Sequence, residues 1–119
     1  MKTPASCLAV IAGLISHASF AACEMPSLIA SIPDGTTATE EDLFQAQTQV
    51  QAYIAAMDDY IACQNEEMRA SGDGASEQYL YQMAERIAAA RAEVDAVATD
   101  FNDQVQAFRA ARQFPAGNR

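Results

Sequence analysis

Cys23 and Cys63 are two of the three cysteines in this 119-residue chain, and their side chains can form a covalent cross-link. Cys7 lies in an expected signal peptide, so cleavage would leave two cysteines. An exported chain with an even number of cysteines usually pairs them, so Cys23 and Cys63 predict a disulfide. A second reading puts a lipid anchor on Cys23 and leaves Cys63 as a lone thiol. We prefer the disulfide, because Phe20 stands where the processing site of a lipoprotein usually carries a branched aliphatic residue.

The third cysteine, Cys7, belongs to a segment with the pattern of a secretory signal peptide. Residues 1–21 combine a positive start, an apolar run over residues 7–15 and small residues before a cleavage site after Ala21. An uncleaved anchor helix is the alternative, but a span needs roughly 20 apolar residues and this run is shorter. We therefore expect a periplasmic or secreted mature chain with no membrane span.

Two carboxylate pairs, Asp58-Asp59 and Glu66-Glu67, are the groups of the mature chain that could move protons. Neighbouring residues point in different directions on a helix, so neither pair would converge on a substrate. Cleavage would also leave no histidine and no lysine, which removes the commonest general bases and any Ser-His-Asp or Cys-His arrangement. The sequence therefore predicts no catalytic residue and no enzyme.

The same inventory of residues argues against metals, cofactors and nucleic acids. The chain has no Glu-x-x-His pair, Cys-x-x-Cys-His motif or calcium-loop motif, and two cysteines are too few for a zinc site. The mature chain has six arginines against 16 carboxylates, a side-chain charge of −10 that repels phosphates and anionic lipids. We predict an acidic protein with no metal, no cofactor and no nucleic-acid partner.

A long first helix is expected from about residue 39 to residue 70. Thr39 is a good N-cap, and Thr39-x-x-Asp42 has the spacing of a capping box. Apolar residues then recur at steps of four and three, the heptad pattern of a helix that packs along a second helix. The seam positions are Leu43, Gln47, Val50, Ile54, Met57, Ile61, Gln64 and Met68.

A second long helix is expected from about residue 76 to residue 112, after a short Gly-rich turn over residues 71–74. Two long helices joined by a short turn are antiparallel neighbours. Residues 113–119 contain Pro115 and Gly117 and should fray. The second seam comprises Leu80, Met83, Ile87, Ala90, Val94, Val97, Phe101, Gln104, Phe108 and Ala111.

Tyr53, Tyr60 and Ala56 widen the apolar arc of the first helix beyond what one partner helix covers. They form either an interaction edge or a surface that another part of the chain covers. We prefer coverage, because a disulfide to Cys63, on the same side, would draw the extended residues 22–38 back along this helix. The side chains expected to cover the edge are Leu28, Ile29 and Ile32.

The expected fold is all-α: an antiparallel, coiled-coil-like two-helix hairpin with an extended N-terminal segment folded back on the first helix. Several short motifs are similar to those of a family of small exported bacterial helical-hairpin proteins, a domain of unknown function. The resemblance implies this architecture and supplies no activity. The motifs are Cys23, Ile32-Pro33-Asp34-Gly35, Thr39-Glu40-Glu41, Tyr53 with Tyr60, Cys63, and Phe101 to Val105.

Two functions remain for such a hairpin. The first is a structural or protein-interaction module acting through helix–helix association, with itself or with a protein of the cell envelope. The alternative is a binder of a small hydrophobic ligand, held in a cleft between the hairpin and the N-terminal segment. A continuous exposed apolar stripe favours the first, and a closed apolar pocket favours the second.

Overall fold

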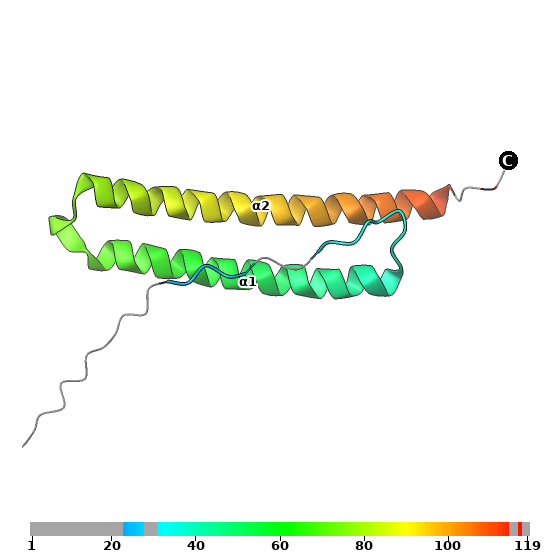
Figure 1. Cartoon of the computed structure of the whole chain (residues 1–119), viewed down its shortest axis with the longest axis horizontal. Helices are drawn as coiled ribbons and strands as arrows, with labels where there is room; N and C mark the ends of the chain where they lie inside the picture. Colours follow the sequence, from blue (N-terminus) through cyan, green and yellow to red (C-terminus); the bar gives the residue numbers. More distant parts are fainter. Residues whose placement is uncertain (1–22, 28–30, 115–116, 118–119) are drawn as a thin grey trace, which may run out of the picture.

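A computed structural model describes residues 23–27, 31–114 and 117, and these form an all-α hairpin as predicted (Figure 1). Helix α1 spans Glu40–Ala70, the short 3-10 helix η1 spans Gly72–Gly74, and α2 spans Glu77–Gln113. The two long helices run antiparallel, side by side along their whole length. The expected signal peptide, together with Leu28 and Ile29, lies outside the described residues.

Local capping sets where the helices begin. The Thr39 hydroxyl accepts a 3.1 Å hydrogen bond from the Asp42 backbone N–H, and the Asp42 carboxylate accepts one of 2.9 Å from the Thr39 N–H. This is the predicted capping box, and it satisfies N–H groups that the first turn of a helix leaves without partners. Ser76 caps α2 in a simpler way, since its hydroxyl accepts from the Tyr79 backbone N–H. Both helix starts are therefore encoded locally.

The turn between the helices depends on a glycine. Gly72 has φ +64°, a left-handed conformation that glycine adopts without a steric penalty. The Ser71 N–H donates to the Glu67 carbonyl at the end of α1, and the Ala75 N–H then donates to the Gly72 carbonyl. The chain reverses within a few residues, which makes the two helices antiparallel neighbours.

The core lies along the seam between α1 and α2. Met57 and Met83 are its most deeply buried large side chains, 0% and 2% exposed. The two seam glutamines of α1 differ, because Gln47 is exposed whereas Gln64 is 3% exposed. The other fully buried apolar residues are Leu43, Ala46, Val50, Tyr53, Ile87 and Ala90. Nearly all of them occupy predicted seam or edge positions.

The N-terminal segment runs along α1 and then crosses onto α2 (Figure 1). Gly35 is buried, and its backbone N–H donates a 2.9 Å hydrogen bond to the Gln104 side-chain carbonyl oxygen, Oε1. A Cβ on Gly35 would collide with the Gln104 carbonyl and lie 2.9 Å from the Phe108 backbone nitrogen. The segment therefore bridges both helices, whereas the sequence placed it on the first helix alone.

Neither helix in the described part of the chain contains a stretch that is long and apolar enough to cross a bilayer.

Candidate functional site

Cys23 and Cys63 meet on the side of α1 that the N-terminal segment follows. Their sulfur atoms lie at disulfide-bonding distance and their Cα atoms are 5.8 Å apart, inside the range that a disulfide requires. This confirms the predicted proximity and favours a disulfide over a lipid anchor on Cys23. The pair joins positions 40 residues apart, so it fastens the start of the described chain to the second half of α1.

A carboxylate lies beside this cysteine pair. An oxygen of half-buried Glu67 is within 4.8 Å of both sulfur atoms. Thiolates bind metals, whereas the sulfur atoms of a disulfide carry no charge. With the cysteines paired, Glu67 is the one anionic ligand of this cluster, which is too few for a metal site.

The predicted edge of α1 faces the same way as the cysteine pair. Tyr53 is 4% exposed, and Tyr60 and Ala56 are half-buried. Burial, and then the negative charge of Glu93 on α2, raise the pKa of the Tyr53 hydroxyl above its usual value. That hydroxyl has no hydrogen-bond partner among the described residues. A partner protein therefore has little access to Tyr53.

The turn at Asp34 anchors the far end of the N-terminal segment. One carboxylate oxygen of Asp34 accepts hydrogen bonds from the Thr36 hydroxyl, at 2.7 Å, and from the Thr36 backbone N–H, at 2.8 Å. These bonds hold the pKa of Asp34 below its usual value. The turn presents the Gly35 N–H to Gln104, so this side of the hairpin is fastened at both ends.

A small cleft lies between the N-terminal segment and α1, where the ligand-binding alternative would need one. Its volume is about 230 Å³, below the 300–1,000 Å³ that is typical of ligand pockets. Most of its lining side chains are polar. They are Ser31, Pro33, Asp42, Gln45, Ala46 and Gln49.

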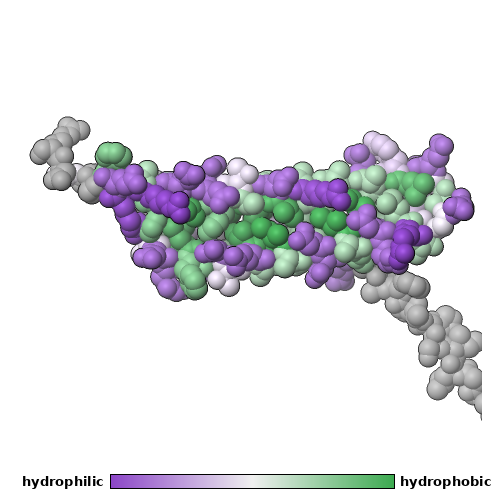
Figure 2. Space-filling model, turned by 180° about the vertical axis from the view of Figure 1, so that it is seen from behind, coloured by the Kyte–Doolittle hydropathy of each residue, from purple (hydrophilic) through white to green (hydrophobic). Residues whose placement is uncertain are grey.

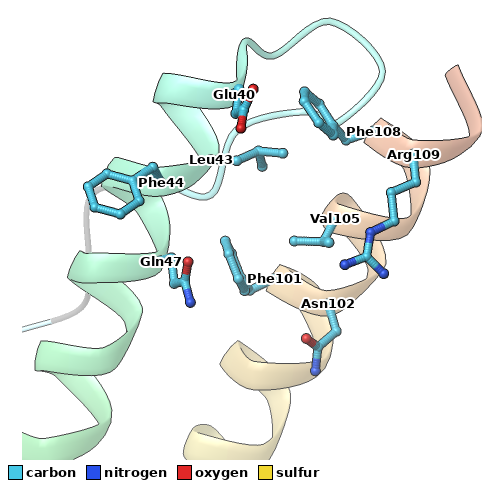
Figure 3. Close-up of a pocket in the computed structure, with 9 residues that line it drawn as sticks. All are labelled: Glu40, Leu43, Phe44, Gln47, Phe101, Asn102, Val105, Phe108 and Arg109. Carbon is cyan, nitrogen blue, oxygen red and sulfur yellow. The ribbon is translucent and has the colours of Figure 1, made fainter. Parts of the chain in front are cut away.

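A larger groove opens between the start of α1 and the last third of α2 (Figure 3). Its volume is about 430 Å³. Leu43 and Gln47 project from α1 toward Phe101 and Val105 on α2. The remaining lining residues are Glu40, Phe44, Asn102, Phe108 and Arg109. The groove combines an apolar floor with one acidic and one basic residue at its rim.

This groove belongs to the side of the hairpin that faces away from the N-terminal segment, which we call the open face. Seen from behind, apolar residues follow the line between the two helices and hydrophilic ones flank them (Figure 2). Phe44, which lines the groove, is 64% exposed. An apolar stripe of this kind on a protein surface usually marks an interaction site.

The predicted carboxylate pairs lie outside this groove. Asp58 and Asp59 are exposed, and Glu66 accepts a 2.7 Å hydrogen bond from the Arg69 guanidinium on the surface. The seam identified Leu43, Phe101 and Phe108 but not Phe44 or Val105, which lie beside it. Phe44 follows a seam residue directly, and an aromatic residue at that position was the available signal.

We compared the chain with known proteins: no family model, no curated protein and no solved structure matches it. The site is therefore interpreted from its own geometry, and the family resemblance stays a prediction.

Proposed function

We propose that this chain is a non-enzymatic, exported protein-interaction module that acts through helix–helix association on its open face. The observation that carries the proposal is the difference in exposure between two aromatic residues of α1. Tyr53, on the side of the N-terminal segment, is 4% exposed, whereas Phe44, on the open face, is 64% exposed. A helix pair with an uncovered apolar stripe has the surface that a further helix or helix pair packs against.

The export part of the proposal rests on the cysteines and on the signal-peptide pattern. A pair at disulfide-bonding distance is typical of proteins that mature in an oxidising compartment. The charge balance of the mature chain fits a protein partner better than a phosphate-rich or lipid partner. The cleft beside the N-terminal segment gives the ligand-binding alternative less support, since it is small and polar.

The chain offers a matched pair of positions for testing the open face. Phe44 and Tyr81 are aromatic and are 64% and 67% exposed, but only Phe44 lines the groove. A photo-crosslinking phenylalanine analogue would replace each of them in the full chain expressed in its host. We expect more protein adducts from position 44, at the groove, than from position 81 after illumination. Equal labelling from both positions, or none from either, would contradict the proposal.

A further inference from the structure

We propose that the partner on the open face is a second copy of this chain, an inference that rests on the proposed function. Two hairpins associate as an antiparallel four-helix bundle in which α1 of each copy lies over α2 of the other. This arrangement buries the open faces of both copies against each other. The charges along the open face favour this arrangement.

The outer edges of the two helices carry opposite charges on the open face. Glu40 and Asp58 are on α1, and Arg91 and Arg109 are on α2; all four are exposed. The two acids are 18 residues apart, and so are the two arginines. Eighteen residues make five full helical turns, so each pair projects from one side of its helix. Because Glu40 and Arg109 line the groove, all four side chains lie along the open face.

The acids and the arginines also occupy matching levels along the hairpin. Glu40 and Arg109 line the same groove. Met57 and Ala90, the residues directly before Asp58 and Arg91, belong to one buried cluster. The open face therefore has two levels about 27 Å apart, each with an acid on α1 and an arginine on α2.

These four charges are not used within the hairpin. The ion pair that the described residues form joins Arg69 to Glu66, on the surface of α1. A further cation, Arg112, lies over the ring of Phe108, with its guanidinium carbon 3.3 Å from the ring centre, and extends the basic edge of α2. At these two levels the open face thus presents an acid on α1 and an arginine on α2 to whatever packs on it.

Symmetry selects one way of pairing two such faces. A twofold axis parallel to the helices puts α1 of one copy over α2 of the other at the same level, so Glu40 meets Arg109 and Asp58 meets Arg91. An axis across the helices puts α1 over α1 and brings Glu40 to Asp58, which repel each other. The charges therefore favour the first arrangement and oppose the second. The apolar side chains of the groove supply affinity, since exposed ion pairs are individually weak.

The test is charge reversal on the disulfide-intact chain, with association measured by sedimentation equilibrium. One variant carries Arg91→Glu and Arg109→Glu, and a second carries Glu40→Arg and Asp58→Arg. Each variant alone should dissociate, with Kd raised at least about 10-fold, because like charges then face each other. An equimolar mixture of the two should restore a dimer, since an all-acidic face then meets an all-basic one.

A control variant makes the same two kinds of substitution, Glu to Arg and Asp to Arg, at positions that do not lie on the open face. Glu41→Arg with Asp59→Arg changes the next residue in each case, and both positions are exposed. One residue along a helix is a rotation of about 100°, so this variant should dimerise at least as well as the natural chain. Circular dichroism checks that every variant keeps its helices. Equal loss of association in control and test variants would overturn the proposal.

Three combined outcomes decide between this inference and the proposed function. If the natural chain is monomeric and the crosslinker at Phe44 captures a different envelope protein, the dimer is wrong and the interaction module stands. If the chain is monomeric and position 44 gives no adduct, both proposals fail. An adduct of twice the mass of one chain, together with a mixture of reversed variants that dimerises, supports both.

Discussion

On one side of the hairpin, the N-terminal segment is fastened to Cys63 on α1 and to Gln104 on α2, and Tyr53, on the same side of α1 as Cys63, is 4% exposed. On the other side, Phe44 is 64% exposed and lies at a groove of about 430 Å³. The two sides belong to the same pair of helices with the same heptad seam. The two sides differ in how far their apolar side chains are exposed, because the N-terminal segment is attached to one side only.

This difference shows how a two-helix hairpin of this size completes a core. Two helices bury one stripe each, and a small domain needs further burial or a cross-link to be stable. Here the extended N-terminal segment, which we call the strap, adds a cross-link and further contacts on one side, and the open face keeps exposed apolar residues. Under the proposed function, stability depends on the strap side and association on the open face, so substitutions on each side should have distinct effects.

Removing the disulfide should have the largest effect on the stability of the fold. Closing a loop of 40 residues stabilises a fold by about 4 kcal/mol in the chain-entropy model. Reduction should therefore lower the melting temperature sharply, and Cys23→Ser and Cys63→Ser should each match the reduced protein. Thermal unfolding followed by circular dichroism, with and without reductant, measures this. Reductant should not change the double serine variant, and two free thiols in the oxidised folded chain would contradict the pairing.

Truncating an aromatic residue on each side should separate stability from association. Tyr53→Ala should cost about 3 kcal/mol of unfolding free energy, because it empties a buried site. Phe44→Ala should cost less than about 0.5 kcal/mol in the monomer, since its side chain is mostly exposed. Chemical denaturation at concentrations where the chain is monomeric measures the unfolding free energies of the two variants.

A conservative change at the same buried position is the control. Tyr53→Phe removes a hydroxyl that has no partner among the described residues, so it should be neutral or slightly stabilising. A large loss of stability in Tyr53→Phe would show that the hydroxyl is hydrogen-bonded. Similar losses for the two alanine variants would contradict the contrast between the sides.

Gly35 tests whether the strap must touch α2. Gly35→Ala places a methyl group against the backbone at Gln104 and Phe108, neither of which is a flexible side chain. The turn must move away from α2, which should destabilise the fold by about 2 kcal/mol. Gly74→Ala is the matched control, because a Cβ there meets nothing within 4 Å. Equal melting temperatures for the two variants would mean that the contact between Gly35 and α2 contributes nothing.

Much of the hairpin could be predicted because its signals are local. The N-cap Thr39, the Gly-rich turn over residues 71–74 and the two seams predicted both helices, and α1 begins at Glu40 and α2 ends at Gln113. The cysteine pair also followed from the sequence, since parity and reach along the first helix suffice to propose it.

The contacts that join separate elements could not be predicted in this way. The Asp34-Gly35 dipeptide is a turn signal in the sequence, but contact with Gln104 depends on how far the strap extends once both helices are paired. Predicting the groove requires knowing which residues of α1 and α2 lie at the same level along the hairpin. A pattern along one helix does not contain that information. The heptad pattern likewise assigned Gln47 and Gln64 to equivalent positions, although one is exposed and one is buried.

Acid should have the smallest effect, and it should act on the strap side alone. Hydrogen bonds from the backbone and then the side chain of Thr39 lower the pKa of Asp42, and those from Thr36 lower the pKa of Asp34. A carboxylate with a lowered pKa contributes stability that is fully present above its unfolded pKa of about 3.9. That contribution is lost as the pH falls through the lower folded pKa.

The measurement is an NMR titration of backbone amides from pH 6 to about pH 2. The Thr36 and Thr39 amides, which donate to these carboxylates, should shift with midpoints below about 3.9, as the joint between strap and α1 loosens. The Tyr79 amide is the control, since it donates to the Ser76 hydroxyl, which does not titrate in this range. Midpoints at or above 3.9 would mean that the charged carboxylates are not stabilised at the joint. Matching shifts at Tyr79 would mean that acid loosens both ends of the hairpin, and the two sides would not differ in this respect.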